Sequence, residues 1–195
     1  TAPSKGIPVM TSEKVRDPDP IRSDKQRNNA VRVLGIDPGS RICGYGIIET
    51  AVRSRGQSKD GYIYIASGRI ELSVKLPLHL RLKEIYDELT DIIREHRPTE
   101  AAVERVFFAK SARAALNLGH ARGVSLLAAT SERLPVYEYS ALEVKKAVVG
   151  YGRAEKRQVQ QMVRTILNLR TALSPDSADA LALSICHLNT MRLGR

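Results

Sequence analysis

The chain has 195 residues, of which 31 are Lys or Arg and 21 are Asp or Glu, so its net charge at pH 7 is +10. This length is sufficient for one domain with a substantial core, and a hydrophobic content of 43% excludes a chain that is disordered throughout. The excess positive charge favours a polyanionic partner, and nucleic acid is preferred to a membrane surface because Trp is absent and Phe occurs only twice.

The chain ends and the cysteines indicate the domain limits and the compartment. Residues 1–30 contain few bulky apolar side chains and are expected to form a flexible tail, followed by one domain over 31–190 and a C-terminal tail over 191–195. Cys43 and Cys186 lack metal-ligand spacing and are interpreted as reduced core residues. No signal peptide or membrane-spanning run is visible, so we expect a cytoplasmic protein that does not enter a membrane.

The first half of the domain is predicted to contain three strands and a helix. Residues 31–36 are apolar and β-branched, and the Pro-Gly pair at 38–39 ends them in a tight turn. Extended apolar sequence resumes at 44–48, and a third strand is predicted over 62–70. Apolar residues then recur at helical spacing over 77–96, which predicts an amphipathic helix.

The second half alternates helices with strands. Residues 101–106 form a short apolar run typical of a buried central strand. A capping-box pattern at 140–143 predicts the start of a helix, and Ser174 followed by Pro175 predicts the start of the last one. The remaining elements are predicted as a helix over 111–131, a strand over 136–139 and a helix over 154–169.

This order of elements predicts the fold class. Three antiparallel strands followed by alternating helices and strands indicate an α/β fold with a mixed five-stranded sheet and helices on both faces. We expect the strand order 3-2-1-4-5, with strand 2 antiparallel, which is the order of the ribonuclease-H-like fold.

Two acids lie at the ends of predicted central strands. Asp37 closes the first strand, although an Asp before Pro-Gly also commonly starts a turn. Glu104 lies in an otherwise apolar strand, where an ionised carboxylate is costly unless it is paired or bound to a metal. A salt bridge to a core arginine is the structural alternative for Glu104.

The last helix adds two more acids. Asp176 and Asp179 are three residues apart and therefore share one face of a helix that is apolar on nearly every side. A first-turn acid favours the helix dipole, which alone would explain Asp176 but explains Asp179 less well. Four carboxylates from three elements favour Mg²⁺, with Mn²⁺ as a substitute, and two such ions about 4 Å apart support phosphodiester cleavage.

Eight short motifs in one order strongly resemble the RuvC family of Holliday-junction resolvases, and the resemblance covers about residues 31–189. They are LGIDPGS at 34–40, GYG at 44–46, ERVF at 104–107, AK at 109–110, GHARG at 119–123, VVGYG at 148–152, AEK at 154–156 and DSADALA at 176–182. The resemblance implies a homodimer that nicks two opposed strands of a four-way DNA junction with Mg²⁺. It also implies work alongside the RuvA and RuvB branch-migration proteins.

The resemblance also implies roles for single residues. All four acids fall on catalytic positions of the family, and Lys145 and Lys156 match its functional lysines. Phe107 matches a base-stacking position, which agrees with an aromatic side chain beside a nuclease site; burial of Phe107 and Phe108 in the core is the alternative. Three further basic residues fall in the region that faces DNA and the second subunit in the family, namely Lys110, Arg113 and Arg122. Arg105 departs from the family, where we expect glutamine.

Two other functions remain as alternatives. An ATPase of the actin or sugar-kinase type has a similar first turn, but it requires a duplicated second half for which 195 residues leave no room. A junction-binding protein without catalysis would be expected to have lost one of the acids, and none is missing here. The sequence therefore favours a structure-selective endonuclease, and the family resemblance implies that its products carry 5′-phosphate and 3′-hydroxyl ends.

Overall fold

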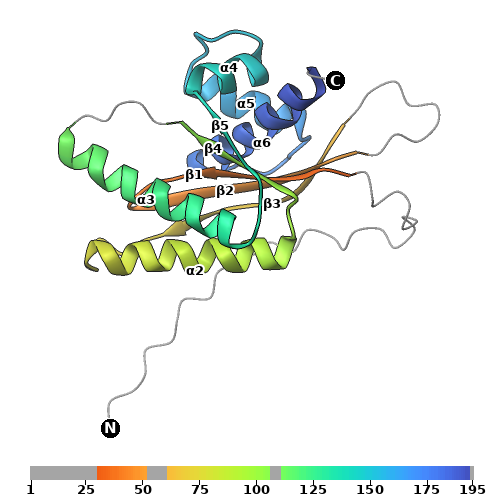
Figure 1. The fold of residues 1–195 in the computed structure, drawn as a ribbon. Helices are drawn as coiled ribbons and strands as arrows, with labels where there is room; N and C mark the ends of the chain where they lie inside the picture. The colour runs from red at the N-terminus through yellow and green to blue at the C-terminus, as the bar shows by residue number, and fades with distance from the viewer. Residues whose placement is uncertain (1–29, 52–60, 106–110, 194–195) are drawn as a thin grey trace.

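The computed structural model describes residues 30–51, 61–105 and 111–193. The elements follow one another in the predicted order (Figure 1). Their bounds are β1 Arg32–Asp37, β2 Ile42–Thr50, β3 Tyr62–Glu71, α2 Leu78–His96, β4 Glu100–Glu104, α3 Ala112–Ser131, β5 Val136–Tyr139, α4 Ala141–Val149, α5 Lys156–Ile166 and α6 Pro175–Leu193.

The five strands form one mixed sheet in the order β3-β2-β1-β4-β5. β2 pairs antiparallel with both β1 and β3, whereas β4 runs parallel to β1 and to β5. The predicted strand order and the ribonuclease-H-like fold are therefore confirmed. β1 and β4 lie inside the sheet, so their apolar side chains are covered on both faces.

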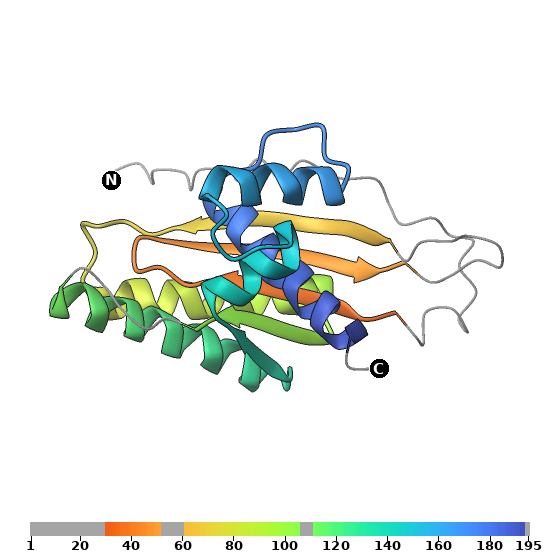
Figure 2. The same ribbon diagram turned by 90° about the horizontal axis from the view of Figure 1, so that it is seen from above.

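Helices cover the two faces unequally. α2 and α3 lie on one face, and α4, α5 and α6 lie on the other, where α6 crosses the sheet diagonally (Figures 1 and 2). Alternation along β1 supplies both cores, because Val33 packs with the α4–α6 side and Leu34 with the α2–α3 side. Every second residue of β1, counted from Val33, therefore directs its side chain toward α6.

Serine residues cap three of the helices, and two of these caps, Ser140 and Ser174, were predicted. The hydroxyl of Ser111 accepts a hydrogen bond from the backbone amide of Ala114, and Ser140 forms the predicted capping box with Glu143. The hydroxyl of Ser174 accepts from the amide of Ser177 at 3.2 Å. These caps fix where α3, α4 and α6 start.

Some element ends differ from the prediction. α5 begins at Lys156 rather than at 154. Just before it, the backbone amide of Glu155 donates a hydrogen bond to the Gln158 side chain at 2.8 Å. α6 runs to Leu193, so it continues beyond the domain boundary predicted at 190. β4 is described to Glu104, and residue 106 of the predicted strand lies outside the described residues, as does the predicted tail up to residue 29.

The C-terminal half of α6 is anchored by a buried polar group. His187 is fully buried; its Nδ1 hydrogen-bonds with the Tyr139 hydroxyl at 2.7 Å, and its Nε2 contacts the carboxylate of Glu100. These contacts tie α6 to β4 and β5. Cys43 and Cys186 are both buried and unpaired, as expected. In the described part of the chain, no helix combines the length and apolarity needed to cross a membrane.

Candidate active site

Two of the predicted acids stand at the carboxyl ends of neighbouring strands. The β1–β4 register runs to the pair Ile36 and Val103, so the residues that follow, Asp37 and Glu104, close the two strands side by side. Because the strands are parallel, both carboxylates belong to the same edge of the sheet. Asp37 and Glu104 are half-buried there.

Glycines on β1 and β2 allow α6 to rest directly on the sheet backbone. A Cβ atom at Gly44 would lie 2.4 Å from the carbonyl oxygen of Asp176, and one at Gly35 would lie 1.9 Å from that of Ala180. Both distances are shorter than a van der Waals contact, so only glycine fits at these positions. Gly44 pairs with Asp37 in the sheet, and the first turn of α6 is therefore held beside Asp37.

The charges of the four acids converge on Asp37. Burial raises the pKa of Asp37 to about 7, and the neighbouring charges of Asp179, Glu104 and Asp176 add to this rise, while Lys156 opposes it. The predicted convergence of carboxylates from β1, β4 and α6 is therefore visible in the electrostatics of the site.

Glu104 and Asp179 are perturbed in the same sense. Burial raises the pKa of Glu104, and the charge of Asp179 raises it further. Burial also raises the pKa of Asp179, although its hydrogen bond and ion pair with Lys156 partly offset the effect. Each carboxylate is therefore held in surroundings that disfavour its charged form unless a cation is near.

Lys156 supplies the positive charge of this region. As the first residue of α5, it places its ammonium against the carboxylate of Asp179. Burial works against the charge of Lys156, but Asp179 prevails and raises the pKa of this lysine. Lys145 lies half-buried on α4, and among the described side chains no hydrogen bond or ion pair joins it to the four acids.

The donor set suits a hard divalent cation. All four candidate ligands are carboxylates. Burial and the neighbouring negative charges raise the pKa of Asp37 and so disfavour its ionised form, which a bound cation would stabilise. Within the described residues, no three acidic, His or Cys side chains are already close enough to hold an ion. The carboxylate of Asp179 instead contacts the ammonium of Lys156.

The residues predicted to bind DNA have different environments. Arg113 is exposed in the first turn of α3. Arg122 is engaged inside the protein, since its Nε donates to the carbonyl oxygen of Glu104 at 3.2 Å and its Nη2 lies 2.7 Å from the carboxylate of Glu138. Phe107 and Lys110 lie outside the described residues.

Two further arginines support the strand ends, and sequence reasoning did not identify their roles. Arg81 of α2 donates to the carbonyl oxygen of Ser40 at 2.5 Å, in the turn that follows Asp37. Arg105 donates to the carbonyl oxygen of Glu138 at 3.1 Å. Both contacts join residues far apart in the chain, so no local spacing could have revealed them.

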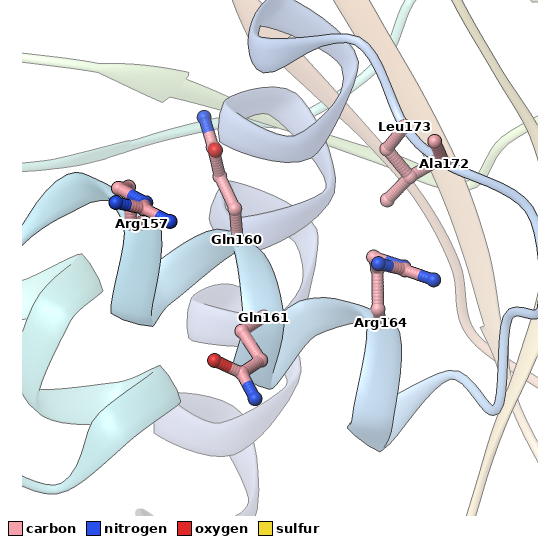
Figure 3. Close-up of a pocket in the computed structure, with 6 residues that line it drawn as sticks. All are labelled: Arg157, Gln160, Gln161, Arg164, Ala172 and Leu173. Carbon is pink, nitrogen blue, oxygen red and sulfur yellow. The ribbon is translucent and has the colours of Figure 1, made fainter.

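A shallow groove lies along α5, next to Lys156 in the chain (Figure 3). Its volume is about 300 Å³. The groove is lined by basic, amide and small apolar side chains without any acid: Arg157, Gln160, Gln161, Arg164, Ala172 and Leu173. None of the four carboxylates belongs to this lining, so the groove is a separate basic surface.

The strand order, together with a helix that crosses the central strands, defines the ribonuclease-H-like class of protein. The family described as crossover junction endodeoxyribonuclease RuvC matches residues 33–187. The chain therefore belongs to the RuvC family.

Individual relatives agree with this assignment. The crossover junction endodeoxyribonuclease RuvC of Syntrophotalea carbinolica is 52% identical over 163 residues, which cover 84% of this chain and 97% of the relative. The RuvC of Shewanella pealeana is 51% identical over 158 residues, covering 81% of this chain and 87% of the relative. Among solved structures, Thermus thermophilus RuvC in complex with Holliday junction substrate is 34% identical, with a TM-score of 0.75 and coverage of 84% of this chain and 96% of that one.

Proposed function

We propose that this protein is an endonuclease that resolves four-way DNA junctions by metal-dependent nicking of two opposed strands. The observation that carries the proposal is the meeting of Asp37, Glu104 and the N-terminal turns of α6 at one edge of the sheet. Membership of the RuvC family and the relatives' shared name support the choice of substrate. The products carry 5′-phosphate and 3′-hydroxyl ends.

The four carboxylates are the proposed ligands of two Mg²⁺ ions, for which Mn²⁺ can substitute. When bound, this pair of ions supplies an activated water and balances the charge that develops on the scissile phosphate and on the leaving oxygen. Asp37 and Asp179 are assigned to the ions directly, and Glu104 and Asp176 complete the ligand shells. Because these acids are half-buried, the effective dielectric constant around them is lower than in water, and their interactions with charged groups are stronger.

Lysine and arginine side chains act on the DNA. The ammonium of Lys156, which lies beside Asp179, would contact phosphate oxygens and stabilise their negative charge. Lys145 on α4 is proposed for the same task. Arg113, which is exposed at the start of α3, is proposed to contact the backbone of the junction. Lys110 is proposed to contact that backbone as well, and Phe107 to stack on an unpaired base.

A second copy of the chain is the proposed partner in cutting. The exposed face of α3 carries Leu116 and Leu127, which are 65% and 56% exposed. Between them lie Gly119 and Gly123, around which the described protein leaves open space. A strip of large and small apolar residues of this kind suits a helix from another subunit. A homodimer would present two sites to two opposed strands, and cooperation with RuvA and RuvB is proposed from the family.

The test is incubation with a synthetic four-way junction in Mg²⁺, Mn²⁺ or chelator, with a linear duplex of the same sequence as the control substrate. We expect paired nicks in the junction only when a divalent cation is present. The Asp179→Asn variant should retain junction binding and lose nicking. Junction binding without nicking by the wild type would instead identify a non-catalytic binding protein, and cleavage by Asp179→Asn would refute the assigned site.

A further inference from the structure

The backbone carbonyl of Glu104 lies at the end of the ladder of backbone hydrogen bonds between β1 and β4. The amides of Ala101 and Arg105 donate to the β5 side, at 2.9 and 2.8 Å, so the carbonyl of Glu104 points toward β1. The last registered pair is Ile36 with Val103, and the next ladder bond would require an amide N–H at position 38. Position 38 is proline, which has no N–H to donate.

Arg122 supplies the missing donor. Its Nε lies 3.2 Å from the carbonyl oxygen of Glu104. Val103 packs in the core on the α2–α3 side, so the Glu104 side chain projects to the opposite, α6 side of the sheet. Arg122 therefore reaches from α3 to the backbone of Glu104 and leaves its carboxylate free. The Arg122 side chain is only 23% exposed.

Glu138 of β5 fixes the direction of Arg122. One of its carboxylate oxygens lies 2.7 Å from Nη2 of Arg122. The other oxygen lies 4.0 Å from Nε of Arg105, and Nη2 of Arg105 donates to the Glu138 carbonyl oxygen at 3.1 Å. Arg105, at the position where the family pattern predicts glutamine, thus adds a second cation to the same carboxylate. The ion pair of Arg122 with Glu138, and the hydrogen bond from Arg105 to the Glu138 carbonyl, hold the end of β4 between α3 and β5.

We propose that Arg122 is a positioning residue that, with Glu138, fixes the backbone of Glu104, and that it does not bind DNA. The inference rests on the proposed function, because it assigns a role in metal binding to Glu104. Without Arg122, the last residue of β4 has a carbonyl group without a donor, and its carboxylate loses its fixed approach to the ions. Loss of Arg122 should therefore weaken metal binding and slow nicking, and should leave the affinity for the junction unchanged.

The experiment compares Arg122→Met, which keeps the apolar stem and removes the donors, with Arg113→Met on the same helix. For Arg122→Met we expect the single-turnover nicking rate to fall about 10- to 100-fold and the Mg²⁺ concentration for half-maximal rate to rise about 10-fold. The rise in unfolding temperature on adding Mg²⁺ should shrink in parallel. Its Kd for the junction in chelator should stay within about twofold of wild type, whereas Arg113→Met should weaken binding and reduce the salt slope by about one.

Two further variants test the same positioning role. Glu138→Gln should shift the Mg²⁺ dependence in the same direction by a smaller factor, and Arg122→Lys should recover part of the rate. The proposal is overturned if Arg122→Met behaves like Arg113→Met, or if neither the metal dependence nor the rate changes. If Arg122→Met does not fold, Glu138→Gln decides by the same readouts. Failure of the wild type to nick junctions would refute the proposed function instead.

Discussion

Asp37 is the residue on which the electrostatics of the site converge. It keeps its proton in the folded protein up to about pH 7, whereas an unperturbed Asp carboxyl loses it near 3.8. Its contribution to the free energy of unfolding is therefore complete below about pH 4 and is lost as the pH rises through 7. Without metal, the ionised carboxylate at neutral pH is a destabilising element of the fold.

Removal of this charge should stabilise the metal-free protein. Asp37→Asn is expected to raise the free energy of unfolding at pH 8 by on the order of 1–3 kcal/mol, and the unfolding temperature by about 5 °C. The gain should be smaller at pH 5, where the native carboxyl is protonated. Thermal unfolding in chelator at both pH values measures the effect. An equal or lower unfolding temperature at pH 8 would show that Asp37 is already balanced by its surroundings.

At the scale of residues, the sequence indicated which acids meet, and the family resemblance indicated Lys156 as a nearby cation, but neither indicated which acid each cation contacts. Four carboxylates could be identified because they interrupt apolar strands and an apolar helix, which is a local signal. The pairing of Lys156 with Asp179, and of Arg122 with Glu104 and Glu138, depends on rotamers and on packing between distant elements. Such contacts leave no trace in spacing along the chain.

Among the elements, α6 depends on the glycines beneath it. Gly35→Ala would place a Cβ atom 1.9 Å from the carbonyl oxygen of Ala180. This distance is too short for a contact, so the backbone of α6 or of β1 would have to move. We expect a loss of about 3 kcal/mol in the free energy of unfolding, at the upper end of the usual cost of overpacking, measured by denaturant titration. The same substitution at Gly61, where the nearest atom to an added Cβ is the Ala51 Cβ at 3.7 Å, serves as the control. It should be neutral or stabilise the protein by about 0.4–1 kcal/mol, because alanine restricts the unfolded chain. Similar losses in both variants would contradict close contact of α6 with the sheet.

The basic groove of α5 is expected to hold an arm of the junction. Arg157 and Arg164 line it without any neighbouring acid in the lining, and guanidinium groups donate readily to phosphate oxygens. The double variant Arg157→Glu with Arg164→Glu should weaken junction binding by at least about 10-fold and lower the salt slope by about two. Binding assays over a range of salt concentrations measure both.

The control for this prediction lies on the opposite face of the sheet. Lys83 of α2 forms an ion pair with Asp87 at 2.5 Å. Lys83→Glu should leave both the affinity and the salt slope near wild type. Equal weakening by the two variants would indicate a general effect of net charge and would remove the groove from the proposed DNA path.

The order of the elements could be predicted because each has a local signal. Ser140 with Glu143 marked the start of α4, and Ser174 with Pro175 marked α6. The start of α5 was missed because Glu155 is not a typical N-cap residue, and its amide is satisfied by a side chain three residues later. The sheet order came from the match between this order of elements and the ribonuclease-H-like fold, since strand pairing is a long-range property that periodicity does not specify.

For the whole molecule, the exposed strip of α3 predicts the oligomeric state. Leu127→Glu should convert the proposed dimer into a single chain of 21.5 kDa, because a carboxylate cannot be buried against a second apolar helix. Light scattering measures the mass, and nicking of the junction should lose its paired cuts. Leu80→Glu on α2, which is 43% exposed, is the matched control and should leave the mass unchanged. A dimer that survives Leu127→Glu would place the interface elsewhere.

The arginines that reach around the sheet have a consequence for how the enzyme responds to heat. Arg81 and Arg122 come from α2 and α3, yet they secure the strand ends whose acids face the other layer. Partial loosening of these two helices would release both supports while the central strands remain paired. Activity should therefore decline on warming before cooperative melting begins, and core substitutions in the layer farthest from the acids should lower the temperature at which it declines.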